Sequence, residues 1–186
     1  MSSVTTIPIA SLLLGFIPVL LLIIIMRAWG LNALHAMYAN IRMLVQLLLI
    51  GYVLTYIFET DEPVFVVLVV IFMIAMSSWI ALRPLTDRGI KPYTVVAIAI
   101  GVSGLGVLML VTQIILELPR WYEPRFVIPL AGMVFANSMN TISLAGERFH
   151  AERGRGEDYL SARRLAMEAA MIPQVNALLA VGLVSL

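Results

Sequence analysis

The segment Val-Phe-Val-Val-Leu-Val-Val-Ile-Phe-Met-Ile-Ala-Met-Ser-Ser-Trp-Ile-Ala-Leu, residues 64–82, decides the fold class of this 186-residue chain. It contains no charged residue, and its length matches the roughly 20 apolar residues that a helix needs to cross the hydrocarbon core of a bilayer. Asp61 and Glu62 lie just before it, and Arg83 follows it directly. We therefore expect this segment to be a membrane-spanning helix.

Similar apolar segments recur along the chain. Together they predict about six spans, at about residues 7–26, 41–58, 64–82, 93–116, 126–145 and 169–186. The composition agrees, because 61% of the residues are hydrophobic and 12% are charged, whereas soluble domains are about 45–50% apolar and about 25% charged. No interdomain linker is visible. The expected fold is all-α, a polytopic transmembrane helical bundle that forms a single domain over residues 1–186.

The basic residues predict the orientation of this bundle. Arg and Lys near the ends of spans stay on the cytoplasmic side of a membrane. Most of the 12 basic residues follow the first, third and fifth predicted spans, which places them on one side. We therefore expect the N-terminus outside, the 147–168 loop in the cytoplasm, and the protein in the inner (plasma) membrane.

Several kinds of chemistry have no basis in this sequence. The chain has no cysteine, which excludes disulfides, thiolate metal sites and cysteine nucleophiles. Its two histidines, His35 and His150, do not favour a histidine-built metal site, and there is no phosphate-binding loop. We expect no enzyme activity, no catalytic residue and no cofactor. The net charge of +1 gives no indication of nucleic-acid binding.

Polar side chains inside the predicted spans are candidates for a translocation pathway, because an unpaired polar group is costly in lipid. Arg42 and Gln46 are one helical turn apart in the second span, and Asn137 and Asn140 lie in a span unusually rich in amides and hydroxyls. Methionine thioethers are soft metal ligands. The pathway candidates are Arg42, Gln46, Met133, Asn137, Met139 and Asn140. The alternative is structural: a snorkelling arginine, helix-bridging amides and packing methionines.

Two further segments carry expectations of their own. The glycine-rich residues 101–106 predict close helix packing or local flexibility, since no Lys-Ser/Thr pair follows to make a phosphate loop. In the 147–168 loop, Glu157 to Ala170 are expected to form a helix, which either docks on a motor subunit or is a solvated connector. The candidate coupling residues are Tyr159, Ala162, Arg163, Arg164 and Ala166.

Three segments carry a family resemblance. They are Ile-Arg-Met-Leu-Val-Gln-Leu-Leu-Leu-Ile-Gly-Tyr-Val-Leu at 41–54, Ile-Pro-Leu-Ala-Gly-Met through Asn-Ser-Met-Asn at 128–140, and Ile-Pro-Gln-Val-Asn through Val-Gly-Leu-Val-Ser-Leu at 172–186. In this order they resemble the Fet-type permease family, the membrane subunits of iron-export ABC transporters. Plant aluminium-sensitivity permeases are similar. The matching positions are Arg42, Gln46, Gly51, Gly132, Asn137, Met139, Asn140, Pro173 and Gly182.

The resemblance implies a permease that works with a separate ATP-binding cassette ATPase subunit, as a homodimer of permeases with two ATPases. It also implies export of a metal ion, with iron suggested, and it assigns no metal-binding residue. The family continues beyond the position of Leu186, so we expect a C-terminally truncated member. Two alternatives stay open: an ATP-independent secondary transporter or channel, or a membrane scaffold that transports nothing. A secondary transporter predicts buried ionisable residues along its route, and these spans carry few.

Overall fold

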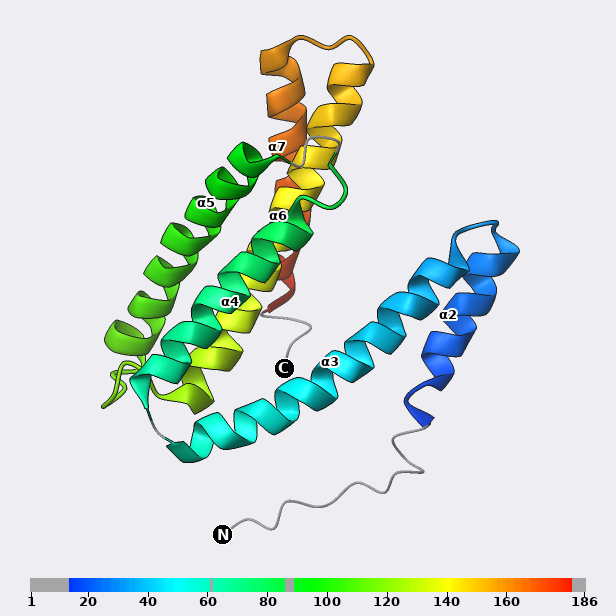
Figure 1. The fold of residues 1–186 in the computed structure, drawn as a ribbon. Helices are drawn as coiled ribbons and strands as arrows, with labels where there is room; N and C mark the ends of the chain where they lie inside the picture. Colours follow the sequence, from blue (N-terminus) through cyan, green and yellow to red (C-terminus); the bar gives the residue numbers. More distant parts are fainter. Residues whose placement is uncertain (1–13, 61, 86–88, 182–186) are drawn as a thin grey trace. The chain divides into compact units, whose positions relative to one another are not determined.

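The computed structural model describes residues 14–60, 62–85 and 89–181, and gives the backbone alone for residues 54–60 and 181. Within these ranges all regular structure is helical (Figure 1), which confirms the all-α fold class. The chain forms two compact units, Met1–Tyr56 and Ile57–Leu186, which are treated separately.

The first unit holds α2 (Ile17–Ala28) and most of α3 (Ala33–Thr60). The turn between them contains Gly30, whose φ of +69° is a left-handed conformation that glycine adopts without steric cost. Asn32 follows and accepts a hydrogen bond on its side-chain Oδ1 from the His35 backbone N–H at 3.1 Å. Such a cap satisfies one of the free N–H groups at the start of a helix.

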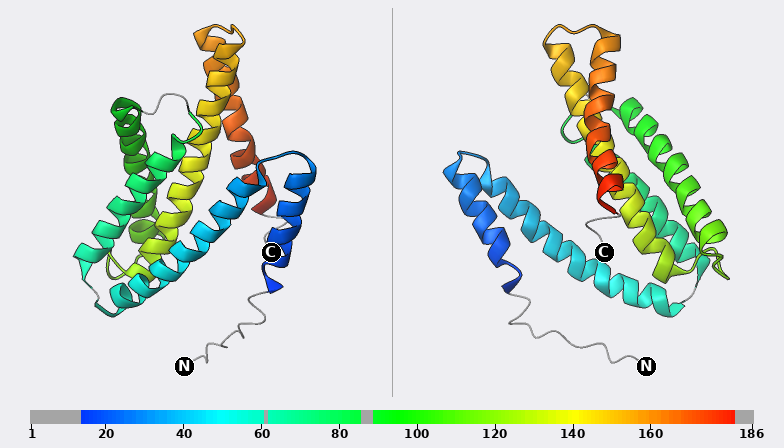
Figure 2. Two further views of the ribbon diagram at one scale, coloured as in Figure 1. Left: turned by 45° about the vertical axis from the view of Figure 1, so that its right-hand side comes forward. Right: turned by 180° about the vertical axis from the view of Figure 1, so that it is seen from behind.

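The second unit is a helical bundle built around α6 (Figure 2). It comprises α4 (Pro63–Ala81), α5 (Ile90–Met109), the π-helical turn η1 (Leu110–Ile115), α6 (Pro124–Gly154) and α7 (Tyr159–Val181). α6 contacts α4, α5 and α7, and α4 also contacts α5. Pro63 and Pro124 each lie in the first turn of a helix, where the missing N–H of proline costs nothing.

The core of this unit lies where α4, α5 and α6 meet. Phe135 is 2% exposed and packs with Val66 and Ile100, one from each neighbouring helix. A Cβ atom placed on Gly104 would lie 2.8 Å from Cδ1 of Phe135 and closer still to Cε1. This contact agrees with the close helix packing expected of the glycine-rich segment 101–106. The missing side chain of Gly104 makes room for the phenylalanine ring.

Most large apolar side chains outside this core are exposed, as expected for helices that face lipid. Four helical segments are long and apolar enough to span a membrane: Ala33–Val53, Pro63–Ala81, Ile90–Ile115 and Pro124–Gly154. They correspond to the second to fifth predicted spans. The first and sixth predicted spans extend into residues 1–13 and 182–186, which lie outside the described residues.

The segment predicted as the 147–168 loop is mostly helical. α6 continues to Gly154, and α7 begins at Tyr159, as the expected helix from Glu157 does within two residues, and runs on into the predicted sixth span as far as Val181. The physical reason is local, because residues 147–153 are mainly good helix formers and Arg148 pairs with Glu152 one turn later. The two helices therefore form a hairpin with a short turn, here called the α6–α7 hairpin.

Candidate functional site

A small polar cleft lies among α5, α6 and α7. Its volume is about 340 Å³, and it is lined by Ala99, Ser103, Asn137, Ser138, Thr141, Ile142 and Gln174. Five of these seven residues carry a hydroxyl or an amide, although most of the surface of the cleft is apolar. In this cleft, hydroxyl and amide groups of α5, α6 and α7 lie close together.

The hydroxyl groups of the cleft are held by their own helices. Ser103 donates to the carbonyl oxygen of Ala99 at 2.6 Å, and Ser138 and Thr141 bond in the same way one turn back along α6. Back-bonding of this kind satisfies the hydroxyl hydrogen inside lipid. It leaves oxygen lone pairs, which can accept hydrogen bonds or ligate a cation.

Gln174 joins α7 to this arrangement. Its amide nitrogen Nε2 donates to Oγ1 of Thr141 on α6 at 2.8 Å. Four residues of the cleft were not predicted as site residues from the sequence: Gln174, Ser103, Ser138 and Thr141. The signal for Gln174 was present, because a glutamine within an apolar segment is the same feature that selected Gln46.

The pathway candidates of the fifth span differ in whether they line the polar cleft. Asn137 lines the polar cleft. Asn140 is exposed and does not line it, Met133 is exposed, and Met139 is half-buried. Of the two asparagines predicted as pathway residues in this span, Asn137 therefore contributes its amide to the cleft and Asn140 does not.

The other two pathway candidates lie on α3. Arg42 is half-buried and Gln46 is exposed. Both belong to the unit formed by Met1–Tyr56, whereas the polar cleft belongs to Ile57–Leu186. Their part in a pathway stays a prediction.

The groups in the polar cleft that could bind a metal ion are neutral oxygen atoms. Across the residues that the structure describes, no group of three or more His, Cys, Asp or Glu side chains is placed to hold a metal ion. The cleft instead offers hydroxyl and amide oxygens. Oxygen ligands of this kind suit hard cations better than soft ones.

The tip of the α6–α7 hairpin is organised by a buried carboxylate. Glu152 is 5% exposed, and its Oε1 lies 2.7 Å from Nη2 of Arg148 and 3.0 Å from Nη1 of Arg155. One carboxylate therefore links the last turns of α6 to the connecting turn. Gly156, with φ of +93°, then takes a left-handed conformation that lets the chain reverse.

Asp158 caps the start of α7. Its carboxylate accepts hydrogen bonds from the backbone N–H groups of Leu160 (3.0 Å) and Ser161 (3.4 Å). Hydrogen bonding to the Ser161 side chain, followed by the bond from the Leu160 backbone, lowers the pKa of Asp158 below its ordinary value of 3.8. The charged form of Asp158 is thus the form that holds the helix start.

The five candidate coupling residues have different surroundings. Ala162 and Ala166 are buried, at 0% and 5% exposure, on the α7 row that packs against α6. Tyr159 is exposed and makes an edge-to-face contact with Phe149 across the hairpin, with ring centroids 5.6 Å apart. Arg163 and Arg164 are exposed. The alanines therefore hold the hairpin together, and the other three residues are accessible.

The α4–α5 connection lies at the same end of the bundle as this hairpin. The hydroxyl of Ser143 donates to the carbonyl oxygen of Ala81 at 3.0 Å. A Cβ atom on Gly146 would lie 2.6 Å from Cδ2 of Leu85, so α6 passes close to the start of this connection. Two of the basic segments predicted to share one side of the membrane are therefore adjacent in space.

Comparison with known proteins places this arrangement in a family. The sequence matches an uncharacterised protein family, UPF0014, over residues 9–186. It is 33% identical over 165 residues to a UPF0014 membrane protein of Synechocystis sp. (81% of this chain, 64% of that protein). It is 35% identical over 166 residues to one of Bacillus subtilis (80% and 64%).

A third relative carries a functional name. The chain is 31% identical over 163 residues to the "Probable iron export permease protein FetB" of Escherichia coli (78% of this chain, 60% of that protein). The matches span 60–64% of the length of these three relatives. No solved structure matches. The match over residues 9–186 and the apolar helices confirm the resemblance seen in the sequence, and show that this chain belongs to the UPF0014 family of integral membrane proteins.

Proposed function

We propose that this chain is the permease subunit of an ABC transporter in the inner (plasma) membrane, and that it exports a metal ion from the cytoplasm. In this proposal two permease copies work with two ATPase subunits, which hydrolyse the ATP. The N-terminus faces outward, and the tip of the α6–α7 hairpin, within residues 147–168, lies in the cytoplasm. The name of the Escherichia coli relative supports export and suggests iron as the cargo.

The polar cleft is the observation that carries the proposal. Hydroxyl and amide groups from three helices converge there, although the candidate membrane spans are otherwise largely apolar. Hydrogen bonding between helices accounts for Gln174 and Thr141. Asn137 lines the same cleft without being needed for that bond. An amide in this position can receive a cargo that sheds part of its hydration shell.

The cargo would meet neutral oxygen donors in this cleft. Hydroxyl and amide oxygens bind a cation more weakly than carboxylates do, which allows release as well as capture. A pathway needs both properties, because a cargo that binds too tightly does not leave.

The α6–α7 hairpin is the proposed contact with the ATPase. Its end is stiffened by the Glu152 ion pairs, by the Asp158 cap and by the Phe149–Tyr159 ring contact. A stiff hairpin can transmit a partner's motion to α6, which lines the cleft. Tyr159, Arg163 and Arg164 are the accessible contact candidates at its α7 side.

The partner is tested by affinity purification. The chain is expressed with its genomic neighbours in native membranes, extracted in mild detergent and analysed by mass spectrometry. We expect an ATPase with nucleotide-binding motifs at near-equal stoichiometry. Absence of any such ATPase, both from the purified material and from the neighbouring genes, would overturn ATP coupling.

The cleft is tested with two asparagines of the same helix. In inside-out vesicles that contain both subunits, Asn137→Ala is expected to lower ATP-dependent uptake of Fe²⁺ about tenfold or more, since a hydrogen bond to a charged group contributes about 1.5–3 kcal/mol. Asn140→Ala is the matched control, because its side chain lies outside the cleft. Membrane insertion and ATPase co-purification should be unchanged in both. Equal transport by the two variants would contradict the cleft as the pathway.

A further inference from the structure

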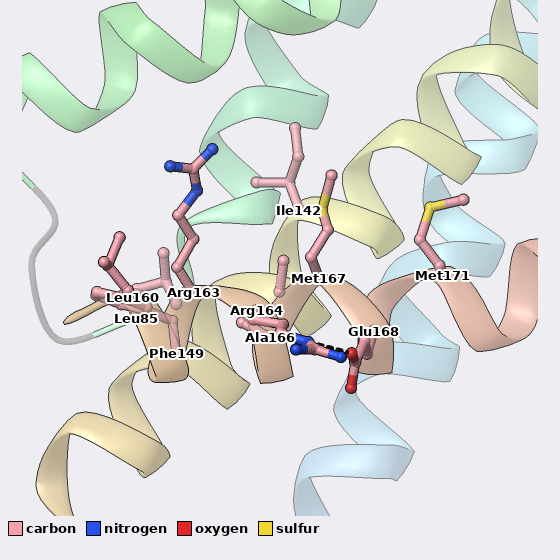
Figure 3. A pocket seen from close by; sticks show the side chains of 12 residues that line it. Leu85, Ile142, Phe149, Leu160, Arg163, Arg164, Ala166, Met167, Glu168 and Met171 are labelled. Carbon is pink, nitrogen blue, oxygen red and sulfur yellow. Dashed lines mark hydrogen bonds and ion pairs between the residues drawn. The ribbon is translucent and has the colours of Figure 1, made fainter. Parts of the chain in front are cut away.

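An open groove runs along the α6–α7 hairpin beside the polar cleft, and Ile142 lines both. Figure 3 shows the side chains that line the groove. Its volume is about 840 Å³, within the range of about 300–1,000 Å³ that ligand sites occupy. The lining is largely apolar and comes from α6, α7 and Leu85, which follows α4. We call it the α6–α7 groove.

The groove lies at the depth of a membrane surface. α6 has 31 residues, which at 1.5 Å per residue is about 46 Å. The hydrocarbon core is only about 30 Å thick, so the last turns of α6 must leave it. If α6 enters the core near Pro124, the side chains from Ile142 to Phe149 lie at the boundary. The groove therefore opens where acyl chains meet headgroups.

The charges of the groove are arranged on two sides of α7. Arg164 pairs with Glu168, with Nε and Oε1 2.8 Å apart. Arg163 extends away from this pair, on the side of Met167 and Met171 (Figure 3). Among the described residues no carboxylate pairs with Arg163. A cation thus stands beside an exposed apolar stripe, of which Met167 is 60% exposed.

We propose that the α6–α7 groove binds an anionic phospholipid, with its phosphate on Arg163 and an acyl chain against the apolar wall. Basic pockets between membrane helices on the cytoplasmic side bind such headgroups. The long apolar wall fits a hydrocarbon chain, and the guanidinium fits a phosphate. The assignment to the cytoplasmic leaflet rests on the orientation proposed above, whereas the binding site itself does not.

The experiment measures lipid retention. The purified chain is reconstituted in phosphatidylcholine vesicles with and without phosphatidylglycerol, and native mass spectrometry counts the lipids that remain bound. The wild type is expected to retain phosphatidylglycerol in preference to phosphatidylcholine. Arg163→Gln should weaken this retention about fivefold, which corresponds to about 1 kcal/mol per basic residue at an anionic surface. Arg164→Gln removes the same charge one residue away and should change retention less.

Two further measurements keep the proposal open to refutation. Leu160→Asp places a carboxylate on an exposed position of the groove wall and should also reduce retention. Soluble glycerol phosphate should not compete, because it lacks the acyl chain. Equal retention in the Arg163 and Arg164 variants would overturn the proposal. The proposal would also be overturned if Arg163→Gln lost ATPase co-purification while its lipid retention stayed unchanged. That result would assign the groove to a protein partner. Neither result depends on transport activity.

Discussion

The contact between Gly104 and Phe135 gives the most direct test of how the bundle packs. In Gly104→Ala, the new Cβ would stand 2.8 Å from ring atom Cδ1, whereas carbon atoms pack at about 3.5–4.0 Å. The ring must therefore move by about 1 Å, and it is 2% exposed, with little free space around it. Overpacking of this size costs about 1–3 kcal/mol.

Gly106→Ala is the matched control, because a Cβ at Gly106 meets no atom within 4 Å. Both changes gain the same helix propensity, about 1 kcal/mol of alanine over glycine. The difference between the two variants therefore isolates the contact with Phe135. We expect Gly104→Ala to be less stable than Gly106→Ala by about 1–3 kcal/mol.

The assay is reversible unfolding in mixed detergent micelles, followed by the circular dichroism of the helices. The two variants should differ in midpoint and share the same slope. Adding Phe135→Leu to Gly104→Ala should recover part of the loss, as a double-mutant cycle requires of residues in contact. A difference below about 0.5 kcal/mol, or no coupling between the two positions, would refute the close approach of α5 and α6.

Three further predictions concern the hairpin and the cleft. Glu152→Gln should destabilise the hairpin by about 1–3 kcal/mol, because the guanidinium groups of Arg148 and Arg155 lose their charged acceptor. The check is to compare its unfolding with that of Glu147→Gln, a change at an exposed neighbour. Equal stabilities of the two variants would contradict the prediction. Gln174→Leu should cost about 0.6–1.7 kcal/mol by removing the bond to Thr141, and the cost should vanish in a Thr141→Ala background. The lowered pKa of Asp158 means that its cap stabilises α7 above pH 3.8 and is lost as the pH falls below that value. The protection of the amides at the start of α7, measured relative to their intrinsic exchange rate at each pH, should therefore fall on acidification in the wild type and be low at every pH in Asp158→Ala.

The span assignments could be predicted because lipid imposes a strict requirement. Every backbone polar group in the hydrocarbon core must be paired within the protein, so a long apolar segment has almost no choice but to be a helix. The segment 64–82 illustrates this, since α4 covers Pro63–Ala81. The π-helical turn Leu110–Ile115 was not predicted, because a shift from i−4 to i−5 hydrogen bonds leaves no mark in hydrophobicity.

The site was predicted in part. Asn137 was selected because an amide in lipid needs a partner, and it lines the cleft. Gln174 was missed because its significance depends on Thr141, 33 residues earlier, which only the packing of α7 on α6 brings within 2.8 Å. A helix from Glu157 was expected, and α7 confirms it from Tyr159 onward. The end of α6, in contrast, was expected to be a loop for a similar reason. Its helical continuation depends on Arg148 and Glu152 pairing in a buried setting, which charge counting cannot distinguish from a solvated surface.

The faces on which these helices meet have to be found by side-chain size. In a soluble protein a polar stripe marks the outside of a helix, so hydrophobic periodicity reveals the buried face. Here lipid is as apolar as the interior, and that contrast disappears. The contacts are marked instead by small residues: Gly104 against Phe135, Gly146 against Leu85, and the buried pair Ala162 and Ala166. Ala162 and Ala166 were selected from the sequence as partner contacts. Because both alanines are buried, these small residues indicate the face of α7 that packs against α6.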